Sequence, residues 1–240
     1  MKLITLNTWG GRVPEKLLRF FGDNQDVDIF CLQEIYNEAK TERMDEEFLN
    51  DSFNLYSDIK NVLTNHVGYF RPHIEDWYGL AIFVKRNIEL QREGDISIHD
   101  IEYTGGGNHP RNLHYIEFEH KGIKTTVANV HGLWNGKGKT DTQERLLQSQ
   151  KIKDFIDSTD GNKILCGDFN LRPDTQSVKM LEHGMRNLIK EYNIESTRTS
   201  LYTKPEKHAD YVFVSPDLEV LNFRVLSEEV SDHAALYLEF

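Results

Sequence analysis

The sequence predicts an α/β protein in which two packed β-sheets are flanked by helices. Nine short apolar segments, many of them rich in β-branched and aromatic residues, have the length and composition of β-strands. Between some of these segments lie stretches with apolar residues at helical spacing. One pair of strands is separated only by His120, Lys121 and Gly122, and such a hairpin requires antiparallel pairing.

The expected strands are distributed along the whole chain. The hairpin spans Leu113 to Val130 and contributes two of them. In chain order the expected strands are Leu3–Leu6, Ile29–Leu32, Leu80–Val84, Leu113–Phe118, Thr125–Val130, Ile164–Cys166, Tyr211–Val214, Leu221–Val225 and Ala234–Phe240.

Three helices are expected between these strands. The first covers Pro14–Phe21, with proline near the first turn, where its missing N–H group costs nothing. The second covers Thr142–Ile156, where apolar residues recur at helical spacing. Asp174 is expected to cap a third, shorter helix over Ser177–Leu181.

The length and composition indicate one domain over residues 1–240. A chain of 240 residues with 38% hydrophobic residues can bury a substantial core, and no linker-like or repetitive segment divides it. Residues Met1 to Trp9 alternate like a strand and lack the apolar core of a signal peptide. No run approaches the roughly 20 apolar residues of a membrane span. We therefore expect a soluble, cytoplasmic monomer without a transmembrane segment.

The charge of the chain narrows the choice of partner. Lys and Arg total 28 and Asp and Glu total 39, so the formal net charge is −11. Tight nonspecific binding to nucleic acid through a basic face is therefore disfavoured. A local basic patch beside a metal can still receive a phosphate group.

The two cysteines, Cys31 and Cys166, each lie inside a short apolar run. Their number and spacing fit neither a disulfide framework nor a zinc site. We expect both to be small buried hydrophobic residues.

Polar residues that could act in catalysis or bind a metal lie where the apolar strands end. Four expected strands are each followed directly by such a group, and these groups are Asn7, Glu34, His131 and the pair Asp168 and Asn170. Asp210 and the pair Asp232-His233 instead precede their strands. If those strands run in the opposite direction, one rim of the sheets can collect all eight residues.

Carboxylates and carboxamides at strand ends suit a hard cation such as Mg²⁺ or Mn²⁺, which takes oxygen ligands. Glu34 is the best single candidate for a direct ligand, although a lone acid at a strand end is commonly a solvated edge residue. Asp168 and Asn170 can orient an attacking water and bind phosphoryl oxygens, with Gly167 allowing close backbone approach. The alternative is an ordinary turn, which Asp, Asn and Gly all favour.

His233 supplies an imidazole beside the carboxylate of Asp232, and Asp210 can hold the tautomer of the ring. A lone Asp-His pair is weak evidence of function. Serine-hydrolase chemistry is set aside because the chain has no Gly-x-Ser-x-Gly nucleophile elbow. A Walker phosphate-binding loop is also absent.

Six short motifs, in this order, resemble the endonuclease/exonuclease/phosphatase superfamily of metal-dependent phosphoesterases, which is DNase I-like. They are Leu6-Asn7, Leu32-Gln33-Glu34, Asn129-Val130-His131, Gly167-Asp168-Phe169-Asn170, Asp210-Tyr211 and Ser231-Asp232-His233. Each motif alone is weak, but their order is specific and they span nearly the whole chain. The resemblance implies a four-layer α/β sandwich with two mainly antiparallel β-sheets.

The resemblance also implies roles for the metal-binding residues and a divalent cofactor, Mg²⁺ or Mn²⁺. Glu34 and Asn7 would place the metal, with Asp232 near it. Such a metal would polarise the phosphate ester for attack by water.

Five further residues would act as catalytic groups by the same resemblance. Asp168 would orient or deprotonate the attacking water, and we favour it over His233 as the base. Asn170 and His131 would stabilise charge on the phosphorus. His233, held by Asp210, would contact the phosphate or transfer a proton.

Substrate contacts are expected from residues outside these motifs. Arg111 matches a position where family members often carry an arginine near substrate, although a surface arginine is an equal alternative. Tyr78 and Trp77 can stack on a base or lie against lipid, whereas aromatic residues beside strands usually belong to the core. Residues 135–139 form a flexible basic loop that can touch a phosphate backbone, although we expect it to be solvated. Arg145 matches a family position at the start of a helix, where a structural role is the alternative.

The leading functional hypothesis is an enzyme that hydrolyses a phosphodiester or phosphomonoester in nucleic acid or a nucleotide-like compound. Residues 6–10 resemble neutral sphingomyelinases, while residues 167–172 resemble the tyrosyl-DNA phosphodiesterases. A phospholipid or inositol phosphate is therefore the second hypothesis. A non-catalytic scaffold is the third, and the presence of Glu34, Asp168, Asp210 and His233 argues against it.

Overall fold

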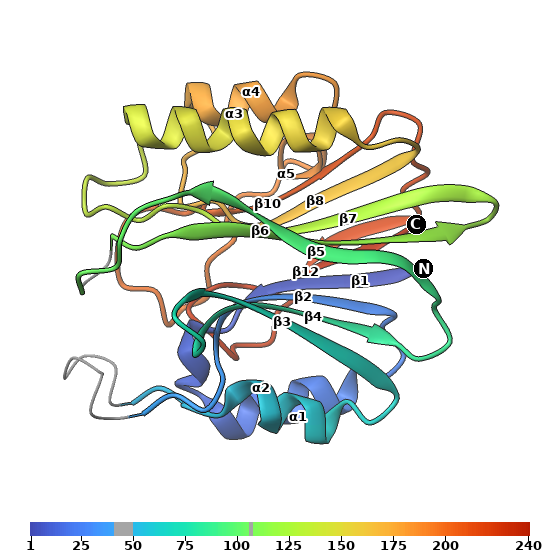
Figure 1. Ribbon diagram of the computed structural model, residues 1–240, viewed down its shortest axis with the longest axis vertical. Coiled ribbons are helices and arrows are strands. Elements are labelled where there is room, and N and C mark those ends of the chain that lie inside the picture. The colour runs from blue at the N-terminus through green and yellow to red at the C-terminus, as the bar shows by residue number, and fades with distance from the viewer. Residues whose placement is uncertain (41–49, 106–107) are drawn as a thin grey trace.

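Two six-stranded β-sheets lie face to face, and helices cover the outer face of each (Figure 1). The computed structural model describes residues 1–40, 50–105 and 108–240. The resulting order of helices, sheet, sheet and helices confirms the predicted four-layer α/β sandwich.

The first sheet contains the N-terminal and C-terminal strands of the chain. Of its strand pairs only β1 and β2 run parallel, and the remaining pairs are antiparallel. Its strands in spatial order are β11 (Asn222–Val225), β12 (Leu236–Glu239), β1 (Lys2–Asn7), β2 (Ile29–Tyr36), β4 (Tyr78–Lys85) and β3 (His66–Ile74).

The second sheet has the same design, with β7 and β8 as its parallel pair. The predicted hairpin is confirmed as β6 and β7, which pair antiparallel. The strands in spatial order are β5 (Leu90–His99), β6 (Arg111–His120), β7 (Ile123–His131), β8 (Asn162–Asp168), β10 (Asp210–Val214) and β9 (Arg186–Asn187).

Helices α1 (Pro14–Asp23) and α2 (Leu55–Val62) cover the first sheet, and α3 (Gln143–Ser158) and α4 (Gln176–Glu182) cover the second (Figure 1). A 3₁₀ helix over Trp9–Gly11 follows β1, and a short helix α5 over Leu188–Glu191 follows β9. None of the helices in the described parts of the chain is long and apolar enough to cross a membrane.

The predicted cap of α4 was wrong by one residue. Thr175 is the N-cap, and its hydroxyl accepts a hydrogen bond from the backbone N–H of Val178. Asp174 instead forms an exposed ion pair with Arg172. The acid that serves this helix start is Asp141, which accepts from the first backbone N–H groups of the helix.

All nine predicted strands are present, but β3, β5 and the two-residue β9 were missed. Strands β3 and β5 each lie at the edge of a sheet, and most of their residues are partly or fully exposed. Edge strands of this kind do not carry the apolar run or the clean alternation by which strands are recognised in a sequence.

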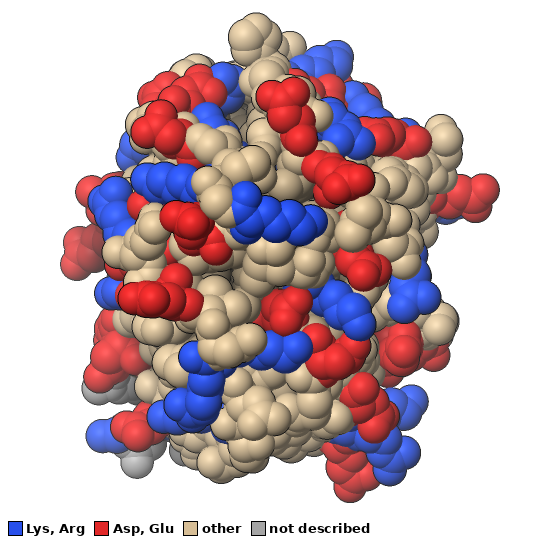
Figure 2. Space-filling view, turned by 90° about the vertical axis from the view of Figure 1, so that its right-hand side faces the viewer, with Lys and Arg blue, Asp and Glu red and all other residues tan. Residues whose placement is uncertain are grey.

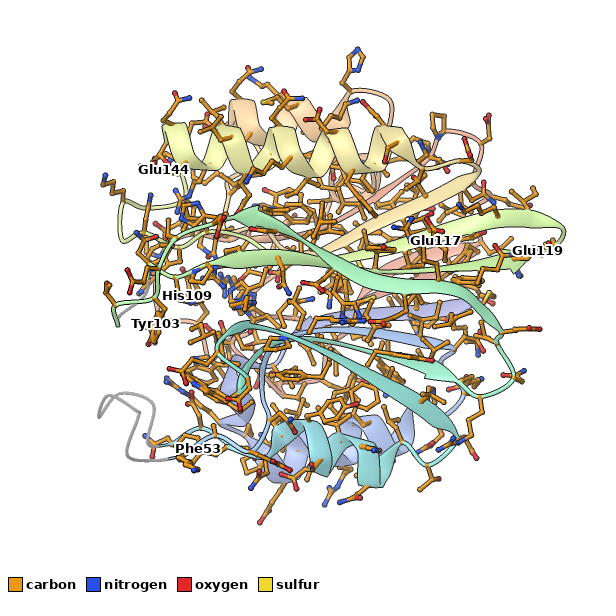
Figure 3. All side chains as sticks on the ribbon, in the orientation of Figure 1. Phe53, Tyr103, His109, Glu117, Glu119 and Glu144 are labelled. Atoms are coloured by element: carbon orange, nitrogen blue, oxygen red, sulfur yellow. The ribbon has the colours of Figure 1, made fainter. Side chains whose placement is uncertain are left out.

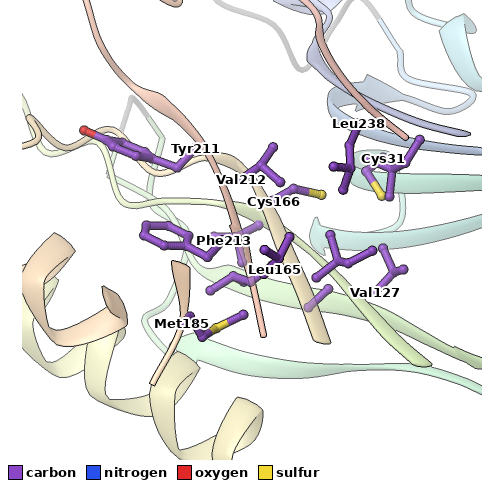
Figure 4. Packing of buried hydrophobic residues seen from close by; sticks show 14 of the residues in the cluster. Cys31, Val127, Leu165, Cys166, Met185, Tyr211, Val212, Phe213 and Leu238 are labelled. Atoms are coloured by element: carbon purple, nitrogen blue, oxygen red, sulfur yellow. The ribbon is translucent and has the colours of Figure 1, made fainter. Parts of the chain in front are cut away.

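The core lies in the space between the sheets and beneath the helices (Figure 4). Successive residues of a strand point to opposite faces, so Cys166 points toward the other sheet while Leu165 points the opposite way. Cys31 and Cys166 are both fully buried and free, which confirms their prediction as buried hydrophobic residues.

A buried polar contact ties the two sheets together below the rim. Asn129 of β7 donates to the backbone carbonyls of Leu32 and Ala81 in the first sheet, at 3.0 and 3.2 Å. Gln33 of β2 donates to the amide oxygen of Asn129 at 2.7 Å. Because these groups are buried and hydrogen-bonded, they fix how the strand ends of one sheet sit over those of the other.

The face around the chain termini lies at the end of the sandwich opposite to the end at which Asn7 closes β1 and Asp168 closes β8 (Figure 1). Acidic and basic side chains are interspersed over this face (Figure 2). The view gives no indication of a continuous basic surface there that could receive nucleic acid.

Candidate active site

The predicted residues converge on one rim of the sandwich, at the ends of the central strands. Register explains the convergence: Asn7 at the end of β1 lies opposite Gln33 of β2, next to Glu34, and His131 lies opposite Asp168 at the ends of β7 and β8. Asp210 lies opposite Asp168 because β10 runs antiparallel to β8. In Figure 3, His109 and Tyr103 mark the rim's end of the molecule, and Glu119 marks the opposite end.

Asn7 joins the two sheets at the centre of this rim. It is fully buried, and its side-chain amide donates to Glu34 Oε1 at 2.9 Å and to Asp168 Oδ2 at 3.0 Å. Its own Oδ1 accepts the backbone N–H of Trp9 at 2.9 Å, which fixes the direction of the amide. One carboxamide therefore holds two carboxylates, from β2 and from β8, close together.

Glu34 reaches the rim through an irregular backbone. The register of β2 shifts between Leu32 and Ile35, and Glu34 has a positive φ of 58°. A β-bulge redirects a side chain in this way. The side chain is 25% exposed, and burial of the carboxyl raises the pKa of Glu34 despite the hydrogen bond from Asn7.

Asp168 lies at the middle of the cluster and is 1% exposed. Its Oδ1 accepts the backbone N–H of Asn170 at 2.8 Å. Burial opposes ionisation of this carboxyl, but the nearby cations His233 and Lys139 lower the pKa of Asp168 far below its usual range. The group is therefore an anion at neutral pH. Gly167 precedes it with a φ of 132°, where a Cβ would collide with the carbonyl oxygen of Val130.

Asp210 and His233 form a hydrogen-bonded pair beside Asp168. His233 Nδ1 lies 2.8 Å from Asp210 Oδ1, and the other oxygen of Asp210 accepts from the hydroxyl of Thr197 at 2.8 Å. Nε2 of the same ring points to Asp168 Oδ2 at 3.6 Å. Burial disfavours the imidazolium, but the carboxylates of Asp210 and Asp168 raise the pKa of His233 above its ordinary value.

His131 has the opposite character. Burial, and then the charge of Arg111, lower the pKa of His131 well below its usual value, so its ring is neutral. Its Nε2 lies 3.8 Å from both Asp168 Oδ2 and Glu34 Oε1, and its buried Nδ1 has no partner among the described residues. The ring can therefore offer a hydrogen bond to a ligand in the site.

Arg111, at the start of β6, is a buried cation with free donors. It is 2% exposed, and its Nε and Nη1 find no partner within the described ranges. Tyr78 lies close enough to interact with its charge. His73 and His109 stack beside this group, with ring centroids 5.2 Å apart. The structure thus brings both predicted substrate-contact residues, Arg111 and Tyr78, to the rim.

Asp232 is the fourth acid of the rim, after Glu34, Asp168 and Asp210, and its surroundings suit the binding of a cation. Its buried Oδ1 accepts no hydrogen bond from the described residues and lies 3.8 Å from His233 Nε2, while its Oδ2 lies 3.5 Å from Arg198 Nη1. Asp168, Asp210 and His233 also lie close enough for one atom of each to fall within 4.8 Å of the others. Most of the ligand atoms in these two sets, Glu34 with Asp232 and Asp168 with Asp210 and His233, are carboxylate oxygens, which suit a hard divalent cation.

The remaining aromatic and arginine predictions turn out to be structural. Trp77 is 5% exposed and packs with Tyr36 in a small apolar cluster. Arg145 is fully buried and donates to the backbone carbonyls of Leu133 and Thr140, at 3.2 and 2.6 Å. It therefore fixes the loop that follows His131.

Sequence reasoning missed Arg198, and for the loop that carries Lys139 it preferred a solvated loop to a phosphate contact. The loop at 135–139 was expected to be solvated, which holds for Lys137 but not for Lys139, whose residue is only 5% exposed. Arg198 lies in the loop before β10 and forms an isolated β-bridge with His233. A lysine or arginine in a loop gives no sequence signal that distinguishes it from an ordinary surface residue.

Structures of similar fold cover the full chain. The mannosyl-6-phosphatase Bt3783 of Bacteroides thetaiotaomicron VPI-5482 has a TM-score of 0.72 and 20% identity, covering 100% of this chain and 98% of its own. A functionally unknown conserved protein from Enterococcus faecalis V583 has a TM-score of 0.76 and 19% identity, with 100% and 98% coverage. D. rerio TDP2, humanized by 14 mutations, has a TM-score of 0.70 and 15% identity, with 99% and 97% coverage.

Sequence comparison gives the family directly. No curated protein matches the chain by sequence. The model of the Endonuclease/Exonuclease/phosphatase family matches residues 4–233, which include every residue of the rim described above. The chain therefore belongs to the endonuclease/exonuclease/phosphatase family.

Proposed function

We propose that this protein is a divalent-metal-dependent phosphoesterase that hydrolyses phosphomonoester or phosphodiester bonds, with nucleic acids and nucleotide-like compounds as its substrates. The observation that carries the proposal is the convergence of Glu34, Asp168, Asp210 and Asp232 with two histidines on one rim. Four carboxylates gathered at one rim repel one another, and a bound divalent cation relieves that repulsion.

The donor set supports Mg²⁺ or Mn²⁺ as the cofactor. Glu34 and Asp232 would hold the ion directly, because Glu34 is partly open and one oxygen of Asp232 accepts no hydrogen bond from the described residues. Asn7 would position Glu34 through its amide. When bound, the ion supplies Lewis-acid stabilisation of charge on the phosphoryl oxygens.

Asp168 is the residue that we assign to the attacking water. Its low pKa keeps the carboxylate ionised at any pH at which the protein works, so it can always accept a hydrogen bond from that water. Asn7 and the backbone N–H of Asn170 fix both of its oxygens. Orientation of the water is therefore built into the site before substrate arrives.

His233 is the proton donor in this scheme. Its raised pKa favours the imidazolium, and Asp210 holds Nδ1 so that the proton on Nε2 points into the site. A donor at that place can stabilise charge on a phosphoryl oxygen or protonate the leaving oxygen. Asp210 thus acts through the ring that it orients.

Neutral hydrogen-bond donors and one arginine would bind the phosphoryl group. The backbone N–H of Asn170 donates to Asp168 Oδ1, and its side-chain amide has a long hydrogen bond of 3.3 Å to the carbonyl oxygen of Gly132. The ring of His131 lies 3.8 Å from Asp168 Oδ2. Arg111 contributes charge and unpartnered N–H groups from β6, and Tyr78 borders it. Such preorganised donors stabilise the charge that develops during phosphoryl transfer.

A substrate panel tests this proposal. Purified protein with Mg²⁺ or Mn²⁺ would be assayed on single- and double-stranded nucleic acid, nucleotides, a 5′-tyrosyl oligonucleotide, a sugar phosphate, phospholipid and inositol phosphates. We expect metal-dependent release of phosphate or cleavage with a nucleic-acid or nucleotide substrate. Activity restricted to lipid or inositol phosphates would replace the substrate assignment, and no activity on any substrate would favour a non-catalytic scaffold.

A further inference from the structure

Two buried cations lie together on the side of the site that faces β10. Lys139, from the loop after β7, is 5% exposed. Arg198, from the loop before β10, has a side chain that is 5% exposed. Each faces the acidic rim, and neither forms a tight ion pair within the described parts of the chain. Both side chains keep N–H donors that are buried and unused among the described residues, and because a buried donor without a hydrogen bond is costly, a ligand is the expected partner.

The contacts of Lys139 leave donors free. Its ammonium donates to Asn170 Oδ1 at 2.9 Å, and this is its one hydrogen bond among the residues that the structure describes. An ammonium carries three N–H donors. Burial lowers the pKa of Lys139, although the neighbouring carboxylate of Asp168 opposes that shift.

Arg198 likewise has an N–H donor that makes no hydrogen bond to the described residues. Its Nη1 reaches Asp232 Oδ2 only at 3.5 Å, and its buried Nε has no partner among the described residues. The guanidinium lies 4.1 Å from the centre of the Tyr202 ring, which holds it in place from one side. A planar guanidinium with free N–H groups is well suited to bind a phosphate.

The indole ring of Trp134 connects the two loops that carry Lys139 and Arg198. Trp134 lies next to Lys139, whose ammonium is 5.8 Å from the centre of the indole ring. Lys204, which follows Tyr202 in the other loop, approaches the same ring at 5.7 Å. The loop after β7 and the loop before β10 therefore meet around Trp134, beside the two buried cations.

Strand order places this flank opposite Arg111. In the second sheet β6, β7, β8 and β10 are consecutive neighbours, and they present Arg111, His131, Asp168 and Asp210 in that order at the rim. Arg198 joins the β10 side through its β-bridge with His233. A phosphoryl group above Asp168 would thus have cations on two sides.

We propose that Lys139 and Arg198 form a specificity subsite for a terminal phosphate group, so that the preferred substrate is a phosphomonoester. The inference rests on the proposed phosphoesterase function and narrows it. A terminal phosphate carries three non-bridging oxygens and two negative charges, whereas a phosphodiester carries two such oxygens and one charge. Only the monoester has one anionic oxygen for Arg111, a second for Lys139 and Arg198 on the opposite side, and a third for a metal.

With a diester bound, either Arg111 or the pair Lys139 and Arg198 would face an ester oxygen. That oxygen bears a carbon substituent and no formal charge, so it cannot neutralise the buried ammonium and guanidinium. The two cations therefore favour the monoester and also disfavour its competitor, which is how specificity arises from a difference of affinities.

The test compares two esters with the same leaving group, p-nitrophenyl phosphate and bis(p-nitrophenyl) phosphate, in the presence of Mg²⁺ or Mn²⁺. Lys139→Gln and Arg198→Gln keep a hydrogen-bonding side chain but remove the charge. We expect each to lower kcat/KM for the monoester about 10- to 100-fold and for the diester less than about threefold. Arg198→Lys, which restores a charge, should recover part of the monoester preference.

Two matched variants control for loss of positive charge. Lys137→Gln removes an exposed lysine from the same loop. Arg224→Gln removes an arginine that also lies over a tyrosine ring, at 5.0 Å from the centre of Tyr237, but in β11. Neither should change the ratio of monoester to diester activity.

A binding measurement without metal separates recognition from turnover. Titration calorimetry would compare methylphosphonate, in its dianionic form, with dimethyl phosphate on metal-free protein. We expect methylphosphonate to bind more tightly, and the Lys139→Gln and Arg198→Gln variants to lose about 10-fold or more of that affinity. Loss of methylphosphonate affinity with unchanged affinity for dimethyl phosphate would exclude a role limited to positioning Asn170, because Asn170 would contact either compound.

Two results would overturn the inference and leave the proposed function standing. One is a wild-type enzyme that hydrolyses the diester at least as well as the monoester. The other is an equal loss of both activities in the two variants, which would show that Lys139 and Arg198 only position the catalytic groups. By contrast, an inactive wild-type protein that also fails to bind methylphosphonate would overturn the proposed function itself.

Discussion

The side-chain amide of Asn7 on β1 donates to Asp168 Oδ2 on β8 at 3.0 Å, and this bond connects the two sheets at the centre of the rim. The same amide also holds Glu34. The proposed water-orienting carboxylate and the proposed metal ligand therefore share one donor. The geometry of the site depends on how the two sheets are packed as well as on the individual strands.

Replacing Asn7 with alanine should impair catalysis without unfolding the protein. The two carboxylates lose the donor that fixes their spacing, so we expect kcat to fall about 10- to 100-fold and half-activation to need more Mg²⁺. Rates measured across a metal titration check this, with circular dichroism as the control for folding. Unchanged activation by metal would contradict the positioning role of Asn7.

Arg111→Met should separate activity from stability. Two buried guanidinium nitrogens have no partner among the described residues, so removing the charge relieves a desolvation cost. We expect the free energy of unfolding to stay equal or to rise by about 1–3 kcal/mol, while KM for p-nitrophenyl phosphate rises about 10- to 100-fold. A destabilised variant with normal KM would instead assign Arg111 to the scaffold.

Glu93→Gln should reduce stability in a pH-dependent manner. Burial opposes ionisation, but hydrogen bonds from His114 and Arg71 lower the pKa of Glu93 to about 2. A depressed pKa stabilises the fold above the unfolded value of about 4.3, and this stability is lost as pH falls toward 2.

Urea unfolding at two pH values checks the prediction for Glu93. We expect the variant to be less stable by about 1–3 kcal/mol at pH 7 and the difference to shrink at pH 4 and below. The exposed Glu119, at the far end of β6, provides the matched substitution Glu119→Gln, which should have little effect (Figure 3). A difference that is constant with pH would exclude the ionised carboxylate as its cause.

Asn129→Ala should destabilise the contact between the sheets. The change removes the donor to the buried carbonyls of Leu32 and Ala81 and the shortest acceptor of the Gln33 amide, so we expect a loss of about 2–4 kcal/mol. The exposed Asn222, on β11, is the control for replacement of asparagine by alanine in a strand. Chemical unfolding of both variants gives the comparison, and equal stabilities would contradict a locking role for Asn129.

Much of the rim could be predicted because its residues follow or precede strongly apolar strands. Asn7 and Asp168 are the last residues of the buried strands β1 and β8. Glu34 follows the predicted strand over Ile29–Leu32 but lies inside β2, which continues to Tyr36. The directions of β10 and β12 were the remaining condition, and both strands do run antiparallel to their neighbours. The placement of polar residues at strand ends therefore predicts the meeting of Asn7, Asp168 and Asp210, but not the presence of Lys139 and Arg198 beside them.

Other features depend on packing that the sequence does not display. Strands β3 and β5 are half-exposed edges, so their pattern of apolar and polar residues is irregular. Burial of Lys139 results from its meeting with Trp134 and Asn170, which only the folded loops bring about. Thr175 replaces Asp174 as the helix cap because both residue types favour that position, and sequence preference cannot choose between neighbours.

The most direct test of the central claim is the metal-dependent rate of phosphate-ester hydrolysis by wild-type protein and by Asp168→Asn. Both proteins would be freed of metal, returned to Mg²⁺ or Mn²⁺ and assayed on the best substrate of the panel. We predict metal-dependent activity for the wild type and a loss of about 10²- to 10⁴-fold for the variant, with an unchanged thermal transition. Near-wild-type activity of the variant, or activity that persists without metal, would contradict the account.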